Sequence, residues 1–236
     1  MVKTIVLDII CKGAGSMVIS FSGIDGSGKT TQINLLTEYC RANNIRCVRK
    51  WSKARGTPGI MWLKHLVRRD KHMDTNAKLE YRDQIYRSKW KKKLLLMGSL
   101  LDLCWYWGIY FRIVKRKYDL VILDRYIWDT YVEVTTEFGS SVLKKSFLWK
   151  IVDLLALKPE KSILLEIPSD ESLRRDQLKG EITTDALELK EQKVSLYMQL
   201  KEQSKWNVVI NATNSIDDSF REVLKCIGLD GGSNGI

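Results

Sequence analysis

The sequence contains little histidine, little proline and no closely paired cysteines. His65 and His72 are its two histidines, and they are too few and too isolated to indicate a metal site. The five cysteines are scattered and form no C-x-x-C pair, which argues against a disulfide framework and a zinc site. Three prolines and a hydrophobic content of 44% exclude a disordered chain. These absences predict a packed globular protein with reduced thiols and a cytoplasmic location.

The sequence also lacks a long apolar run that is free of charge. Residues 94–111 come closest, because they are nearly all apolar and are flanked by basic residues, but Asp102 lies near their middle. We predict a long buried helix here and not a membrane span. Peripheral contact with a membrane through this helix is the alternative. Four aromatic residues in and beyond this run are expected in the core, although they could instead stack on a base: Trp105, Tyr106, Trp107 and Trp128.

The charge is strongly of one sign. Lysine and arginine number 39 against 28 acidic residues, which gives a net charge of +11. Such a field attracts polyanions, among them nucleotides, nucleic acids and anionic membranes. No RNA-binding signature accompanies the charge, so nucleic acid is the less favoured partner. A solvated basic surface with a site for several phosphates is the simpler interpretation.

Short apolar runs alternate with helical patterns along most of the chain. This alternation predicts an α/β fold with a parallel sheet covered by helices on both faces. The expected strands are 18–21, 45–50, 120–123, 162–166 and 207–210, and the expected helices are 31–40, several within 61–117, 169–178, 185–203 and 215–227. The length suits one domain with a short lid. We expect an extension at 1–16, a domain at 17–228 with its lid at about 176–190, and a flexible tail at 229–236.

A phosphate-binding motif follows the first predicted strand. Residues 23–30, GIDGSGKT, match G-x-x-x-x-G-K-[ST] completely and lead into a predicted helix. The three glycines allow backbone N–H groups to point inward around a polyphosphate, and the helix N-terminus adds positive potential. Lys29 can reach the outer phosphates, and the hydroxyl of Thr30 can take a Mg²⁺ position. The motif predicts that the chain binds a nucleoside triphosphate.

A carboxylate ends the strand predicted at 120–123. Asp124 has the position of a Walker-B aspartate, which organises the metal in P-loop enzymes. A simple strand-end cap is the alternative role. Arg125 follows directly, and its planar guanidinium can clamp phosphate oxygens.

With these two motifs the sequence resembles the thymidylate kinase family of nucleoside monophosphate kinases. Residues 21–32, FSGIDGSGKTTQ, are similar to the family's F-x-G-x-D-G-x-G-K-T-T-Q, and residues 124–126 look like its D-R-[YF]. Weaker similarities cover 164–169, 173–175, 179–181 and 211–213. The resemblance runs from about residue 17 to 227. It implies a three-layer P-loop kinase fold with a five-stranded parallel sheet, and a possible homodimer.

The resemblance also implies roles for particular residues, with ATP and Mg²⁺ as cofactors and nucleotides as substrates. Asp25 would contact the acceptor sugar, Arg125 would bridge the donor and acceptor phosphates, and Arg175 would pack against the adenine. The implied catalytic set is Lys29, Asp124, Arg125 and Lys179. The implied ATP site comprises Gly23, Asp25, Gly26, Ser27, Gly28, Lys29, Thr30, Thr31, Arg175, Ala212 and Thr213; the acceptor site comprises Asp25, Arg55, Arg125 and Tyr126; and the metal ligands are Thr30 and Asp124.

The acceptor side departs from the family pattern. Ser52 stands where the family's acceptor-loop arginine is expected, and Arg55 or Lys53 could substitute. Residues 100–107 contain no arginine where the family carries F-x-x-x-R, and residues 127–131 replace small or hydroxyl residues. The lid offers Lys179 but few other cations.

The sequence therefore predicts ATP-dependent phosphoryl transfer to a nucleoside monophosphate, with thymidylate as the family default. Three alternatives stay open. One is a kinase for a different nucleotide-like acceptor. The second is a non-catalytic or regulatory ATP-binding protein, possibly held at a membrane. The third is a kinase for nucleic-acid ends, which only the positive charge suggests.

Overall fold

A computed structural model describes residues 16–51, 89–178 and 187–229. The chain divides into two compact units. The first, here called the sheet unit, comprises Met1–Ser52, Ile113–Leu143 and Lys158–Ile236; the second, the helical unit, comprises Lys53–Arg112 and Lys144–Leu157. Each is described by itself. Residues 1–15, 179–186 and 230–236 lie outside the described residues, so the predicted extension, lid and tail stay predictions.

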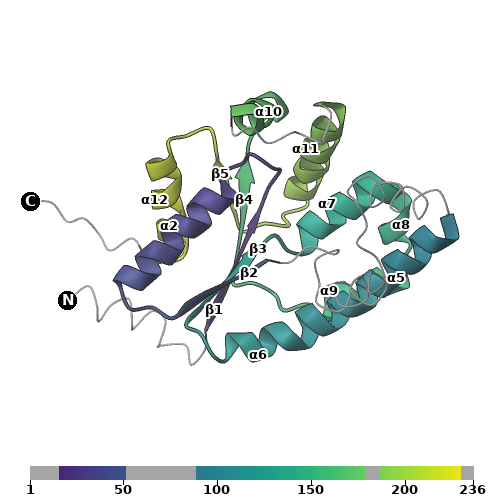
Figure 1. Ribbon diagram of the computed structural model, residues 1–236, viewed down its shortest axis with the longest axis horizontal. Helices are drawn as coiled ribbons and strands as arrows, with labels where there is room; N and C mark the ends of the chain where they lie inside the picture. Colours follow the sequence, from purple (N-terminus) through teal and green to yellow (C-terminus); the bar gives the residue numbers. More distant parts are fainter. Residues whose placement is uncertain (1–15, 52–88, 179–186, 230–236) are drawn as a thin grey trace, which may run out of the picture. The chain divides into compact units, whose positions relative to one another are not determined.

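The sheet unit is built on five parallel strands (Figure 1). They are β1 (Met17–Ser22), β2 (Cys47–Trp51), β3 (Leu120–Asp124), β4 (Lys161–Glu166) and β5 (Val208–Asn211), in the order β2-β3-β1-β4-β5. Strand β3 is buried at all five positions, as expected of a parallel strand with both faces covered. All five strands predicted from the sequence are confirmed, with bounds shifted by one or two residues.

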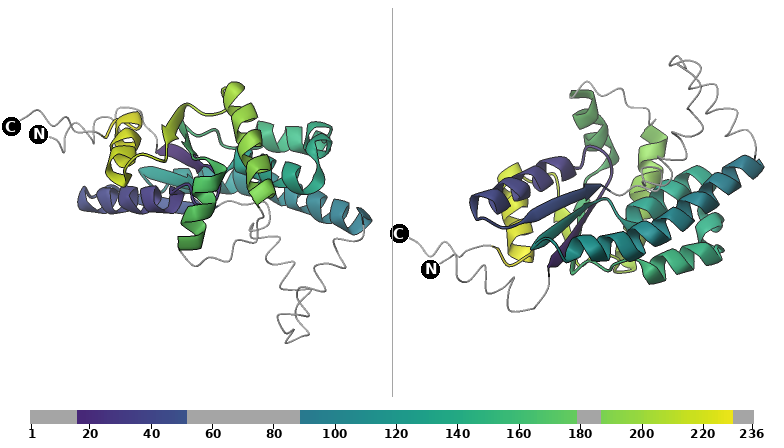
Figure 2. Two further views of the ribbon diagram at one scale, coloured as in Figure 1. Left: turned by 90° about the horizontal axis from the view of Figure 1, so that it is seen from above. Right: turned by 60° about the horizontal axis from the view of Figure 1, so that its bottom comes forward.

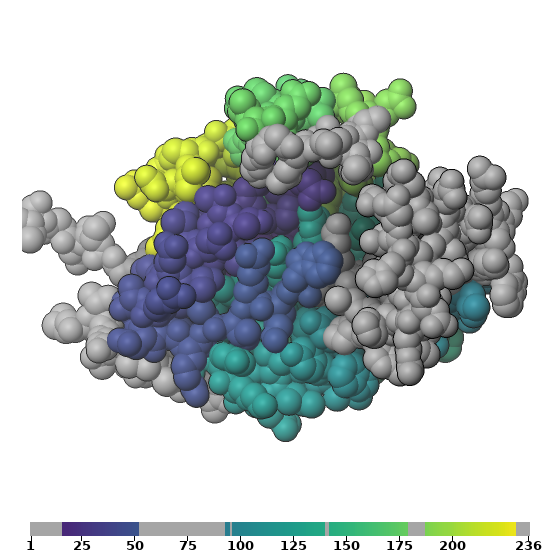
Figure 3. Space-filling view, in the orientation of Figure 1, coloured from purple at the N-terminus to yellow at the C-terminus, as the bar shows by residue number. Residues whose placement is uncertain are grey.

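Helices cover both faces of this sheet. The first face carries α2 (Lys29–Ala42) and α12 (Ile216–Cys226), and the other carries α7 (Ile127–Phe138) and α11 (Leu187–Glu202) (Figures 1 and 2). Helix α10 (Ser169–Leu178) follows β4 and contacts α11. Figure 3 shows the surface of α2 continuous with that of α12. The three-layer α/β arrangement predicted from the sequence is confirmed.

The register of the strands fixes where the functional residues meet. Asp124 at the end of β3 pairs with Phe21 of β1 on one side and with Trp51 of β2 on the other. The chain leaves β1 into the phosphate-binding motif and leaves β3 into Arg125. Because parallel strands end at the same edge, the two motifs are neighbours although about a hundred residues separate them.

The helical unit holds α5 (Lys89–Trp105), the π-helix η1 (Tyr106–Tyr110) and α9 (Phe147–Leu155). Helix α5 packs against α9, and Arg112 ties the π-helix to α9 by donating to the carbonyl of Leu155 at 2.8 Å. The N–H of Leu157 donates to the carbonyl of Trp107 at 3.1 Å. The short helices α6 (Phe111–Lys115) and α8 (Ser140–Lys144) each straddle a boundary between the units.

The prediction that 94–111 is a fully buried helix is wrong for one of its faces. Leu100, Leu103 and Trp107 are buried, as expected. The opposite face, at helical spacing, is exposed and comprises Leu94, Met97, Leu101, Trp105 and Ile109. Trp105 is therefore not a core residue, whereas Tyr106 and Trp107 are. Within the described parts of the chain, no helix is both long and apolar enough to cross a membrane.

Three helices between β3 and β4 were not predicted from the sequence. Helix α7 begins immediately after the D-R-Y residues, and α8 and α9 follow it. Its first turn carries a buried aspartate, Asp129, on a helix whose other buried residues are mostly apolar. Trp128 on the same helix is half buried, and the ammonium of Lys205 lies 4.8 Å from its ring centre.

Candidate active site

The phosphate-binding loop has a backbone that only glycine tolerates at two positions. Gly23 and Gly26 have φ angles of 141° and 78°. A Cβ on Gly23 would lie 2.6 Å from the carbonyl oxygen of Leu165, and one on Gly26 would lie 2.8 Å from that of Ser172. Gly28 (φ 84°) is the N-cap of α2 and has no side chain that could cap the helix. The first N–H groups of α2 are therefore available to an anion.

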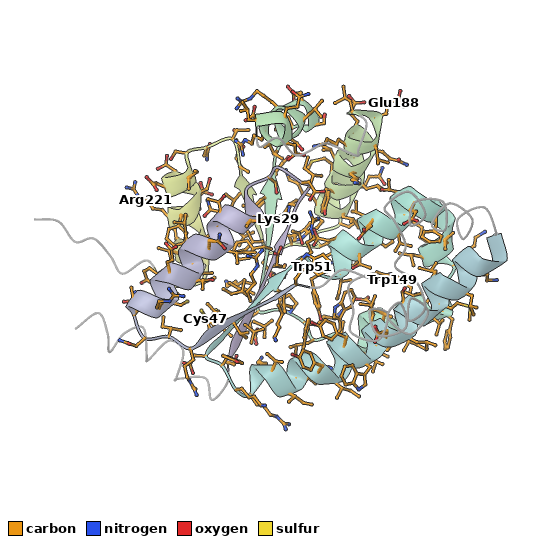
Figure 4. The ribbon with its side chains drawn as sticks, viewed as in Figure 1. Lys29, Cys47, Trp51, Trp149, Glu188 and Arg221 are labelled. Carbon is orange, nitrogen blue, oxygen red and sulfur yellow. The ribbon has the colours of Figure 1, made fainter. Side chains whose placement is uncertain are left out.

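Lys29 is the first residue of α2, and its side chain lies folded over this loop (Figure 4). Its ammonium donates to the carbonyls of Gly23 at 2.9 Å and Ile24 at 2.6 Å, and to the hydroxyl of Ser27 at 3.2 Å. Burial, with a smaller contribution from Arg125, lowers the pKa of Lys29 to about 7. The side chains of Thr30 and Thr31 stay exposed at the helix start. A polyanion at this site would give the ammonium of Lys29 a charged partner in place of these neutral oxygens.

Helix α10 supports the loop from outside. The hydroxyl of Ser172 donates to the carbonyl of Asp25 at 2.6 Å, and the buried ammonium of Lys190 on α11 donates to Ser172 at 3.0 Å. Lys190 also forms a buried ion pair with Asp176. Sequence reasoning missed these three residues, because nothing in their local pattern indicates that α10 and α11 meet beneath Asp25.

Arg125 lies beside the loop, as the sequence predicted. Its φ of 66° is unusual for a residue with a side chain, and its N–H donates to the carbonyl of Phe21 at 3.0 Å. The guanidinium donates to the carbonyl of Gly23 at 3.3 Å and forms an ion pair with Asp25. Burial opposes the charge of Arg125, but the surrounding carboxylates, Asp25 foremost, hold the pKa of the guanidinium above its ordinary value. The side chain of Tyr126, a predicted acceptor residue, is buried.

Asp124 is buried and paired with an arginine that the sequence analysis did not single out. Arg49 of β2 donates to one Asp124 carboxylate oxygen through Nε at 3.1 Å and through Nη2. It also donates to the side-chain oxygen of Asn34 on α2 at 3.3 Å. The pair of Arg49 and Asp124 depends on the register between β2 and β3. Its one signal in the sequence was that a charged residue, Arg49, lies inside a predicted strand. Trp51, two residues further at the end of β2, is half exposed (Figure 4).

The predicted adenine end of the site comes together as well. Arg175 on α10 donates to the carbonyl of Ala212 at 2.9 Å and is held from the other side by Glu171 at 2.7 Å. Hydrogen bonds from Arg174 and Arg175 lower the pKa of Glu171 to about 2. In the loop after β5, the side-chain oxygen of Asn211 accepts from both the N–H and the hydroxyl of Thr213, at 3.0 and 2.8 Å.

Two predicted site residues, Arg55 and Lys179, lie outside the described residues. Within the described ranges, no group of three or more His, Cys, Asp or Glu side chains is placed to hold a metal ion by itself. A metal at Thr30 and Asp124 would therefore need further ligands, as Mg²⁺ takes from phosphates and water.

Comparison with known proteins points to one family. The family model for thymidylate kinase matches residues 108–223. A probable thymidylate kinase of Pyrococcus horikoshii is 26% identical over 89% of this chain and 94% of its own length. Thymidylate kinases of a Sulfurihydrogenibium species and of Plasmodium falciparum are 28% and 24% identical, over 87% and 91% of this chain and 94% and 90% of their own lengths. These matches support the assignment to the thymidylate kinase family that the sequence motifs indicated.

The fold agrees with this assignment. The crystal structure of thymidylate kinase from Ehrlichia chaffeensis matches 90% of this chain and 99% of its own with a TM-score of 0.54, at 19% identity. At that identity the match speaks for the P-loop kinase fold alone. The family model and the curated relatives indicate a nucleotide kinase, a phosphotransferase that acts on nucleotides. The phosphate-binding loop lies before the stretch that the family model matches.

Proposed function

We propose that this protein transfers the γ-phosphoryl group of ATP to a nucleoside monophosphate, with thymidylate as the first acceptor to test. The observation that carries the proposal is the pairing of two features at one sheet edge. One is a glycine loop that leads into the N-terminus of α2, with Lys29 folded back over it. The other is the guanidinium of Arg125, which donates to the loop at Gly23. Phosphoryl transfer depends on positioning and charge neutralisation, which these groups supply.

The donor half of the site fits a triphosphate. A Cβ on Gly23 or Gly26 would collide with the carbonyl oxygen of Leu165 or Ser172, so the two glycines let the loop keep a backbone that can turn N–H groups toward phosphate oxygens. Lys29 would exchange the carbonyls of Gly23 and Ile24 for the outer phosphates. Ser27, Gly28, Thr30 and Thr31 would contribute N–H groups, while Arg175, Ala212 and Thr213 would border the adenine.

Mg²⁺ would be held by the exposed hydroxyl of Thr30 and, through water, by Asp124, which Arg49 keeps in place. When bound, the ion neutralises charge on the outer phosphates. Arg125 would release Asp25 and bind the transferred phosphoryl group, because a doubly charged phosphate attracts the guanidinium more strongly than an exposed carboxylate does. Asp25, Tyr126 and Arg55 are the proposed acceptor contacts, and Lys179 is the proposed lid cation.

The test measures ADP formation from Mg·ATP with a panel of nucleoside monophosphates. We expect at least one, thymidylate first, to raise turnover well above the ATP-only rate, and Lys29→Met to abolish that increase. If ATP binds but no monophosphate raises turnover, the kinase proposal is wrong and the regulatory ATP-binding alternative replaces it. An increase that survives in Lys29→Met would contradict the role proposed for Lys29 at the outer phosphates.

A further inference from the structure

Asp129 is a buried carboxylate to which no role has so far been given. It lies in the first turn of α7, and 1% of its side chain is exposed. One oxygen, Oδ2, accepts from the hydroxyl of Ser22 at 2.6 Å and from the N–H of Tyr126 at 3.0 Å. The other, Oδ1, accepts from the N–H of Gly23 at 3.2 Å and from the hydroxyl of Tyr197 at 2.7 Å.

These four donors come from three parts of the site. Ser22 and Gly23 lead into the phosphate-binding loop, Tyr126 belongs to the D-R-Y residues, and Tyr197 is on α11. Burial, followed by the charge of Asp129, raises the pKa of Tyr197 well above its ordinary value, so its hydroxyl stays protonated and donates. A single carboxylate thereby holds the loop, the turn that carries Arg125 and the neighbouring helix α11 together.

The same carboxylate lies behind Arg125. Nη1 of Arg125 is 3.8 Å from Oδ1 of Asp129, and it donates to the carbonyl of Gly23 at 3.3 Å. On its other side Arg125 pairs with Asp25. The two carboxylates differ in one respect, because 53% of the Asp25 side chain is exposed and Asp129 is enclosed. An incoming phosphate can displace the first and cannot displace the second.

We propose that Asp129 is a positioning residue that fixes Arg125, and the turn carrying it, for contact with the phosphates. The inference rests on the proposed function, in which Arg125 binds the transferred group. Asp129 fixes the turn by accepting the N–H of Tyr126, next to a residue with a positive φ. It also leaves Arg125 with a permanent buried counter-charge when Asp25 is exchanged for phosphate.

Asp129→Asn tests this arrangement without changing its shape. Each carboxylate oxygen accepts one backbone N–H, from Gly23 or from Tyr126. In either orientation, the new amide therefore places its own N–H₂ against a backbone donor that cannot turn away. Tyr197→Phe is the gentler variant, because it removes one hydroxyl and leaves both backbone bonds in place.

The decisive experiment is a double-mutant cycle between Asp129→Asn and Arg125→Met. The readout is calorimetric binding of a bisubstrate mimic, adenosine and thymidine joined by five phosphates, in the presence of Mg²⁺. We expect Asp129→Asn to weaken binding about tenfold in the wild-type background and less than about twofold in Arg125→Met, since coupled residues are not additive. Equal factors in both backgrounds, or no effect in either, would overturn the proposal.

Controls separate this result from folding and from the proposed function. The thermal midpoint of each variant shows whether it is folded, and if Asp129→Asn is not, the cycle is repeated with Tyr197→Phe, for which a smaller coupled loss is expected. Wild-type protein that binds Mg·ATP but not the mimic would refute the acceptor proposal. The double-mutant cycle would then be measured through the affinity for Mg·ATP, and the same coupling between Asp129 and Arg125 is expected. Additive effects of the two substitutions would again overturn the role of Asp129.

Discussion

The phosphate-binding loop, which is the proposed donor side, and the site around Asp124 at the ends of β2 and β3 are built in different ways. In the loop, local sequence determines the geometry: glycines with positive φ, a lysine and a helix start lie within eight residues. At the strand ends, the groups arrive from distant parts of the chain, as with Arg49 and Asp124, which are 75 residues apart. A local motif keeps its form when the rest of the chain diverges, whereas a site assembled by register can exchange its parts.

The strand ends differ from the family pattern that the sequence resembles. The family's acceptor-loop arginine is missing at Ser52, while Arg49 three residues earlier is fixed on Asp124 by two hydrogen bonds to one carboxylate oxygen. Arg125 keeps its place because the β3 register and the hydrogen bond to Phe21 determine it. The difference teaches that the sequence predicts binding of ATP more directly than it predicts which nucleoside monophosphate accepts the phosphoryl group.

The largest effect is expected at the centre of the donor side. Lys29→Met removes the ammonium that would bind the outer phosphates, and we expect turnover to fall by about 10³-fold or more. Steady-state ADP formation measures this, and a thermal midpoint close to that of the wild type would confirm that the variant is folded. Turnover within tenfold of the wild type would show that Lys29 does not contact the reacting phosphates.

The local geometry of the donor loop can be tested with two glycines. Gly26→Ala combines a positive φ with a Cβ 2.8 Å from a backbone oxygen, and we expect it to lower the free energy of unfolding by about 3 kcal/mol. Gly28→Ala, with a similar φ and open space around its Cβ, should cost only about 1 kcal/mol. Urea unfolding measures both. Equal costs would mean that α10 does not restrain the loop.

The site at the strand ends can be tested through Arg49. Arg49→Met leaves the carboxylate of Asp124 buried without its partner, and we expect a loss of about 2 kcal/mol in the free energy of unfolding, less than for a fully buried pair because Arg49 is partly exposed. Arg46→Met is the matched control, since Arg46 pairs with Asp119 at the surface and its removal should have little effect. Similar results for both variants would show that Arg49 does not support Asp124.

The smallest effect concerns pH. The pKa of Lys29 is lowered to about 7 in the free protein, so above pH 7 the lysine loses its proton and must regain one when phosphates bind. The affinity for Mg·ATP should therefore fall by about tenfold per pH unit above 7, with proton uptake on binding.

Calorimetry in buffers of different ionisation enthalpy measures that proton uptake. Lys29→Arg is the control, since its guanidinium stays charged and its profile should be flat, even if its affinity is lower. If the affinity of the wild type for Mg·ATP instead rises with pH above 7, deprotonation of Lys29 does not control binding.

The sequence was sufficient for the strands, the phosphate loop and the neighbourhood of Arg125, because apolar runs and turn glycines act locally. Through the family resemblance it assigned Arg175 and Ala212 separately to the adenine end of the site, and the structure joins them by a hydrogen bond. It could not reveal the partners of Asp124 and Asp129, since those depend on which strands and helices lie side by side. The exposed face of α5 was predicted wrongly, because an apolar helix gives no sign of how many neighbours it has.

The most direct test of the central claim is a calorimetric titration of the wild-type protein with ATP in the presence of Mg²⁺. A saturable isotherm with one site per chain, absent in Lys29→Met, is the predicted result. The absence of any binding heat from the wild-type protein, at several temperatures, would contradict the assignment of the loop around Lys29 as the triphosphate site.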